Sequence, residues 1–222
     1  ALFAADARAV LAVSAPAVLS NLATPVGAAY VTRSMALFGP AAVAGQATVD
    51  RITPVAFGLV FALTGAVGPI IAQNLGARRY DRVRSTLRDS MTFCVLAVVA
   101  AWAVLWLGQD WLVAAFSARG VTADLVRLFC TWTAGGFVFI GALYVSNAAF
   151  NNLGRPLLST VFNWGRATLG TIPFVTLGVP YGPAGVMFGQ VLGAVLFGVA
   201  ATAVAFRVAA RLGRGDPAPE AA

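Results

Sequence analysis

The feature that most constrains this chain is a succession of six apolar segments, each about as long as a helix that crosses a lipid bilayer. Crossing about 30 Å of hydrocarbon takes about 20 helical residues. The six segments are residues 9–30, 52–73, 90–107, 128–150, 157–178 and 184–206. Within lipid every backbone N–H and C=O must find a partner inside the protein, so segments of this kind must be helices. The sequence therefore predicts an all-α polytopic membrane protein, built as a bundle of six transmembrane helices.

The composition supports a membrane protein and argues against nucleic-acid binding. Of the 222 residues, 59% are hydrophobic and only 10% are charged, a balance that a water-soluble domain of this size could not carry on its surface. The net charge of +7 comes from arginines alone, because the sequence has no lysine. These arginines lie between the apolar segments rather than along one stripe. This distribution favours membrane topology and anionic lipid headgroups as its explanation.

The arginines also predict an orientation, because basic residues gather on the cytosolic side of a membrane protein. An N-terminus inside the cell places the second loop, the fourth loop and the C-terminal tail in the cytosol. These regions hold Arg78, Arg79, Arg82, Arg84, Arg88, Arg155, Arg207, Arg211 and Arg214. The outer loops hold Arg33, Arg51, Arg119 and Arg127. We therefore expect a multi-pass protein of the plasma membrane, a bacterial inner membrane, with both termini in the cytoplasm.

Ionisable groups are scarce inside the expected spans. All eight acidic residues fall in the expected loops, at span ends or in the tail, so we expect no carboxylate near the middle of the membrane. An ion-driven transporter usually has such a group. Histidine is absent, which removes the usual general base and the usual zinc ligand. We therefore expect no catalytic residues, no metal site, and a protein that is not an enzyme.

Amide and hydroxyl groups supply the remaining polarity within the spans. Tyr144, Asn147 and Asn151 follow an i, i+3, i+7 spacing that places them on one face of the fourth span. Asn21 and Thr24 share a face of the first span. These five residues either line a water-filled cavity that binds substrate, or form hydrogen bonds between helices. Both interpretations remain open for the fourth span.

Glycines predict where helices pack and where they end. Gly185, Gly189 and Gly193 repeat the spacing of small residues that lets two helix backbones approach closely, and this packing is the favoured explanation for the last span. Gly76 and Gly154 each follow an Asn-Leu pair at the end of a span. Both suit the left-handed position that follows a helix C-terminus.

Arg166 is a charge clearly inside a span. It could bind an anionic group of a substrate, or reach toward the headgroups and neighbouring carbonyls.

Several of these motifs together resemble one family. Residues 68–77 (GPIIAQNLGA) and 79–84 (RYDRVR) resemble the eighth helix and following cytosolic loop of MATE (multidrug and toxic compound extrusion) efflux transporters. Residues 147–156 (NAAFNNLGRP) resemble their tenth helix. The succession of segments, from about Ala9 to Phe206, carries the resemblance more than any single motif.

The resemblance implies a fold and a function. MATE transporters have twelve helices in two six-helix lobes, and this chain would be the C-terminal lobe. Residues 1–8 would be a linker from a missing N-terminal lobe, residues 9–206 the transmembrane lobe, and residues 207–222 a disordered cytosolic tail. The implied partners are a small-molecule substrate, membrane lipid and the missing lobe, with no nucleic acid.

The implied function is secondary active export of organic, often cationic compounds by alternating access. Asn21, Thr24, Tyr144, Asn147 and Asn151 would face the cavity. We expect no cofactor other than a coupling ion, H⁺ or Na⁺, bound in the missing lobe. The alternatives are a lipid or polysaccharide flippase of the same superfamily, or a membrane scaffold that transports nothing.

Overall fold

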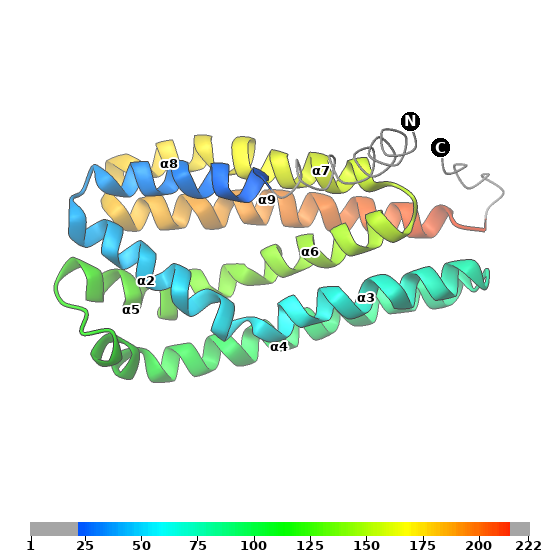
Figure 1. The fold of residues 1–222 in the computed structure, drawn as a ribbon, viewed down its shortest axis with the longest axis horizontal. Helices are drawn as coiled ribbons and strands as arrows, with labels where there is room; N and C mark the ends of the chain where they lie inside the picture. Colours follow the sequence, from blue (N-terminus) through cyan, green and yellow to red (C-terminus); the bar gives the residue numbers. More distant parts are fainter. Residues whose placement is uncertain (1–21, 214–222) are drawn as a thin grey trace, which may run out of the picture.

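The described residues form a long bundle of helices. The structure is a computed structural model that describes residues 22–213. This part of the chain is helical and has no strands. Figure 1 shows the helices running roughly along the long axis of the molecule. The first described helix covers residues 22–36. It is followed by α2 (Pro40–Ala56), α3 (Gly58–Gly76), α4 (Tyr80–Ala115), α5 (Val121–Thr131), the 3₁₀ turn η1 (Thr133–Gly136) and α6 (Phe137–Asn152). The last elements are α7 (Pro156–Gly165), the π-helical turn η2 (Arg166–Gly170), α8 (Ile172–Gly178), the 3₁₀ turn η3 (Val179–Tyr181) and α9 (Gly182–Arg211).

The prediction of an all-helical protein with several membrane spans is confirmed. Among the described residues, four helical stretches are long and apolar enough to cross a membrane. They are Gly58–Gly76, Tyr80–Ala115, Thr133–Asn152 and Pro156–Arg211. The last stretch folds back on itself, because α8 and α9 pack against each other and lie side by side in Figure 1.

The helix that leads into the second span begins at Pro40, earlier than Ile52, where the sequence predicted the span to begin. Gly39 adopts φ 91° and Pro40 follows it at the first helical position, where its missing N–H costs nothing. The helix is interrupted at Phe57 and resumes as α3 at Gly58. Asp50 therefore lies ten residues inside a helix. The sequence predicted a loop or a span end at Asp50, and the structure instead has this residue inside α2, a helix that is not among the four stretches of membrane length.

The fourth span is also interrupted. The helix expected over residues 128–150 begins at Val121, ends at Thr131 and resumes at Phe137. A Cβ on Gly135 would lie 2.9 Å from the Trp102 ring, so the break leaves room for that indole. The indole Nε1 of Trp102 in turn donates a 3.0 Å hydrogen bond to the Cys130 carbonyl, which the break leaves without a helical partner.

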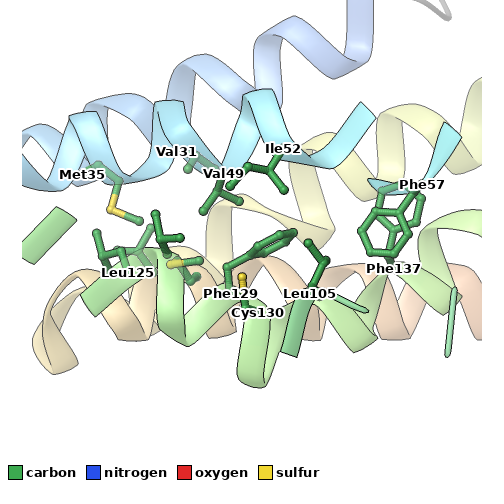
Figure 2. Close-up of a cluster of buried hydrophobic side chains, with 14 of the residues drawn as sticks. Val31, Met35, Val49, Ile52, Phe57, Leu105, Leu125, Phe129, Cys130 and Phe137 are labelled. Atoms are coloured by element: carbon green, nitrogen blue, oxygen red, sulfur yellow. The ribbon is translucent and has the colours of Figure 1, made fainter. Parts of the chain in front are cut away.

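The two interruptions face each other. Figure 2 shows the buried cluster between these helices, with the rings of Phe57 and Phe137 against each other. Their centroids are 4.1 Å apart and the ring planes differ by 5°. Phe57 is the residue at the break between α2 and α3, and Phe137 opens α6 after the second break. One stacked pair of rings thus joins both bent spans.

The fifth span contains a wide turn before Pro173. Residues Arg166–Gly170 form a π-helical turn, and Pro173 lies at the start of α8. A proline has no N–H to donate to the preceding turn, so it breaks the regular helical ladder. The Thr171 hydroxyl donates to the Arg166 carbonyl at 2.9 Å, which adds a side-chain hydrogen bond across the wide turn.

The glycine ridge of α9 packs as predicted. A Cβ on Gly185 would overlap the Gly178 carbonyl of the neighbouring span, and a Cβ on Gly193 would overlap the Gly170 carbonyl. A Cβ on Gly189 would lie 2.5 Å from the Phe174 carbonyl oxygen. The backbones of α8 and α9 therefore touch, and only glycine leaves room for this contact.

The two predicted helix ends differ from each other. Gly154 adopts the left-handed conformation, φ 73°, as expected. Gly76 does not; it is the last residue of α3, and Arg78 takes the left-handed position with φ 54°. The prediction for Gly76 is wrong because the helix continues through the glycine before it turns.

The two ends of the chain were expected to lie outside the helical bundle. The last helix, α9, continues to Arg211, five residues past the expected end at Phe206. The expected linker at residues 1–8, the candidate Asn21 and residues 214–222 of the expected tail lie outside the described residues.

Candidate functional site

A cavity of about 270 Å³ opens in the middle of the bundle. Its wall draws on the helix of residues 22–36, on α2 and α3, on α5 to α6, on the π turn and on α9. Most of the wall is apolar or aromatic. Its polar members are Thr24, Gln46, Asp50, Thr53, Thr133, Tyr144, Arg166, Thr171 and Gln190.

A short series of hydrogen bonds ends at the carboxylate on this wall. Gln190 on α9 donates to the Gln46 amide oxygen at 3.4 Å, and Gln46 donates to the Asp50 carboxylate at 2.9 Å. Gln46 and Asp50 are four residues apart on α2, so their side chains stack on one helix face. Gln190 is next to the glycine ridge in the sequence, and its side chain joins this series. The series fixes where the negative charge of Asp50 sits.

Arg166 brings a positive charge to the same cavity. It is half-buried at the start of the π turn, and its Nε is buried without a hydrogen-bond partner in the structure. No ion pair joins Asp50 to Arg166 or to another basic group among residues 22–213. Both charges are therefore available to a molecule in the cavity. π turns of this kind occur frequently at functional sites.

The aromatic part of the wall is continuous. The Phe61 ring lies edge-on to Phe137 at 5.7 Å and tilted against Tyr144 at 5.8 Å. Such rings offer flat apolar surface to a planar or amphiphilic molecule, and their faces attract cations. A surface of this kind, with one carboxylate and one guanidinium, suits an amphiphile with a charged group.

The structure separates the five residues proposed from the sequence. Thr24 and Tyr144 lie on the cavity wall, and Asn21 is outside the described residues. Asn147 is not on this wall; it is buried and donates a 2.9 Å hydrogen bond to the Asn163 amide oxygen on α7. Asn151 is also not on this wall, and it is exposed. The sequence left two interpretations open for Asn147, a cavity wall or a hydrogen bond between helices. The structure shows the hydrogen bond between helices.

Gln46 and Asp50 were missed because a search for apolar segments discards polar stretches. Three signals for this helix were nevertheless present in the sequence. Gly39-Pro40 is a helix start, and Gln46 with Asp50 is a polar i, i+4 pair. The third signal is the helical spacing of the small or apolar residues Ala42, Gly45, Val49 and Ile52, which the structure buries. Together they describe an amphipathic helix whose polar face looks into the protein.

Comparison with known proteins identifies the fold and the family. The family model described as MatE matches residues 16–177. The crystal structure of the Vibrio cholerae MATE transporter VcmN, a mutant form, superposes with a TM-score of 0.85 at 24% identity, over 94% of this chain and 48% of that one.

Several curated relatives also match, and the chain spans only part of the length of each. A Pseudomonas savastanoi protein, described as an uncharacterized 21 kDa protein in the iaaL 5′ region, is 38% identical over 85% of this chain and 62% of its own length. A Shewanella oneidensis FAD transporter is 26% identical over 88% of this chain and 44% of its own length. A probable multidrug resistance protein NorM of Mesorhizobium japonicum is 28% identical, over 78% and 40%.

The family model covers well over half of the chain, and the helical stretches of membrane length agree with it. The chain is therefore a multi-pass membrane protein that belongs to the MATE family of transporters.

Proposed function

We propose that this chain is the C-terminal six-helix lobe of a secondary active exporter of organic, often cationic compounds. The observation that carries the proposal is the cavity, where the Asp50 carboxylate and the aromatic side chains of Phe61, Phe137 and Tyr144 share one wall. A cationic amphiphile would place its charge near Asp50 and its apolar rings on that surface. The NorM relative supports this choice of substrate class.

The missing partner in this proposal is a second, N-terminal lobe. The chain covers 48% of the VcmN chain, as expected for one of two similar lobes. Export by alternating access then means that the two lobes rock about the substrate. We further propose that the coupling ion, H⁺ or Na⁺, binds in the N-terminal lobe, and that Asp50 receives the cationic group of the substrate.

We assign substrate contact to Thr24 and Tyr144 alongside Asp50. Asn21 precedes Thr24 by three residues on the same predicted helix face, so it stays in the proposed set. Asn147 and Asn151 were proposed with them, and the bond from Asn147 to Asn163 supports a role in holding α6 to α7 for that residue. The proposed orientation keeps both termini and the α3–α4 turn in the cytoplasm of a bacterial inner membrane.

The experiment is export by the whole transporter in drug-sensitive bacteria. An Asp50→Asn protein keeps an oxygen for Gln46 and loses only the charge. The substrate would lose its hydrogen bond to the charged Asp50 carboxylate, and such a bond contributes about 1.5 to 3 kcal/mol. We therefore expect efflux of ethidium to fall by about tenfold or more. The control is Asp110→Asn, which removes an exposed carboxylate paired with Arg127. Unchanged ethidium efflux by Asp50→Asn would contradict the proposal.

A second candidate function is export of an anionic molecule. The unpartnered Arg166 Nε and the FAD transporter relative favour it, and a lipid or polysaccharide flippase would need a basic cavity for the same reason. In vesicles that contain the whole protein, uptake of FAD or a lipid-linked sugar in place of ethidium would select this alternative. Loss of that uptake in Arg166→Gln would assign it to this cavity.

A further inference from the structure

A second pocket, of about 440 Å³, lies where the α3–α4 turn meets the end of α9. In Figure 1 this turn and the end of α9 lie at the same end of the bundle. Its walls are Arg78, Arg79, Tyr80, Asp81, Arg82, Arg84, Leu212 and Gly213. Four arginines and one aspartate give these walls a net charge of +3.

One of these arginines, Arg84, has its side chain fully used in contacts within the protein. Arg84 donates to the Ala209 carbonyl at 3.1 Å, to Ala210 at 3.4 Å and to Leu212 at 2.8 Å, and it pairs with Asp81 at 2.9 Å. This guanidinium caps the C-terminal carbonyls of α9 and fastens them to the first turns of α4. It also neutralises Asp81, which is the acidic group of the pocket wall.

The other three arginines keep their charge available. Arg78, Arg79 and Arg82 are exposed, and they make no side-chain hydrogen bond or ion pair with any residue of 22–213. Arg79 and Arg82 are three residues apart across the start of α4, so they lie on one side of it. Gly213 packs closely against Tyr80 in the pocket wall, since a Cβ on Gly213 would lie 2.7 Å from the Tyr80 ring. The result is a concave site with three guanidinium groups that have no side-chain partner among the described residues.

The backbone at Arg78 closes the end of α3, where the Arg79 N–H donates to the Asn74 carbonyl at 2.8 Å, and it presents the arginine from a left-handed position. Its φ of 54° lies in the left-handed region, which glycine enters easily and a residue with a Cβ enters at a cost of order 1 to 3 kcal/mol. Glycine stands two positions earlier, at Gly76, where φ is not positive. An arginine is therefore held at the position that a glycine would fill with less strain.

We propose that this pocket binds the phosphate headgroup of an anionic membrane phospholipid. The apolar stretch of α3 ends at Gly76, directly before the arginines, so the pocket lies at the level where a span meets the headgroups. Guanidinium groups match phosphate oxygens in geometry and charge. The exposed side chain of Ile70 on the preceding turns of α3 offers apolar surface for an acyl chain. The proposal rests on these residues and not on what the protein transports.

The test is lipid titration of the purified full-length protein in detergent, followed by native mass spectrometry. The probes are phosphatidylglycerol and phosphatidylcholine of equal chain length. We expect tighter binding of phosphatidylglycerol. Each arginine near a membrane surface contributes about fivefold in binding to anionic lipid, so the double variant Arg79→Gln, Arg82→Gln should weaken phosphatidylglycerol binding by about 25-fold. Phosphatidylcholine binding should not change.

The matched control removes two exposed arginines at the opposite end of the bundle. The double variant Arg33→Gln, Arg119→Gln should change phosphatidylglycerol binding by less than about twofold, because neither residue lines the pocket. An equal loss in both double variants would overturn the proposal in favour of a diffuse charge effect. Displacement of the lipid by an equal concentration of soluble glycerol phosphate would overturn it in favour of a free-phosphate site.

A single variant separates binding from folding. Arg78→Gly removes one guanidinium and relieves the backbone, so its unfolding temperature in lipid-free micelles should rise while its affinity for phosphatidylglycerol falls about fivefold. A residue with only a structural role would move both quantities in the same direction. An Arg78→Gly protein that binds phosphatidylglycerol as tightly as the wild type would overturn the assignment of Arg78 to the site.

Discussion

Replacement of Gly189 by alanine tests the contact that joins the last two spans. In the structure the added Cβ would lie 2.5 Å from the Phe174 carbonyl oxygen and 2.9 Å from the Val175 Cα. Both atoms belong to the backbone of α8, so no flexible side chain can move aside. Carbon atoms pack at about 3.5 to 4.0 Å, and the two helices would have to separate by roughly 1 Å.

The magnitude follows from two opposing terms. Forcing an extra methyl group into a packed contact costs about 1 to 3 kcal/mol. Alanine in place of glycine inside a helix recovers roughly 0.5 to 1 kcal/mol. A matched control isolates the first term, because a Cβ added to Gly65 in α3 would meet no atom within 4 Å. The Gly189→Ala protein should therefore be less stable than Gly65→Ala by about 1 to 3 kcal/mol.

The assay is reversible unfolding of the purified protein in mixed micelles, with increasing fractions of a denaturing detergent. The free energy of unfolding is compared between the two alanine variants and the wild type. Equal stabilities for Gly189→Ala and Gly65→Ala would refute the reasoning. That outcome would mean that α8 and α9 move apart at no cost, and that the glycine ridge does not set their distance.

Two further predictions concern hydrogen bonds that hold irregular backbone. Trp102→Phe keeps an aromatic ring but removes the donor to the Cys130 carbonyl. The free energy of unfolding in the same assay should therefore fall by about 1 to 3 kcal/mol. A change smaller than the experimental error would show that water replaces the indole as the donor. Arg84→Gln removes the cap of α9, so hydrogen exchange of the backbone amides around Ala209 should accelerate about tenfold, as measured by mass spectrometry. Arg88→Gln is the control, since within residues 22–213 the Arg88 side chain pairs only with its neighbour Asp89. Equal acceleration in both variants would contradict the capping role.

The sequence was sufficient for features that depend on one segment at a time. Long apolar runs have one way to satisfy their backbone in lipid, so the helical spans followed from hydropathy. The ridge of Gly185, Gly189 and Gly193 predicted close packing because glycine spacing on a helix is a local property. Gly154 likewise fulfilled its prediction at a helix end.

The features that were missed depend on what a helix faces. Asp50 and Gln46 hid α2 from a search for apolar segments, although both side chains line a cavity that other helices complete. Asn147 shares a helix face with Tyr144 by spacing alone, yet Asn163 on a neighbouring helix takes up its amide. A one-dimensional pattern gives the face of a helix, and only the packed neighbours decide whether that face meets a cavity, a partner side chain or lipid.

The stacked rings of Phe57 and Phe137 connect the break between α2 and α3 to the break before α6. On one side of this aromatic pair the short helices α2 and α5 pack together, and on the other side α3 packs with α6. Bending at one break therefore cannot proceed independently of bending at the other, since the two rings must slide or turn as a pair. Asp50 sits on the α2 side of this aromatic pair, so any tilt of that half would carry the carboxylate with it.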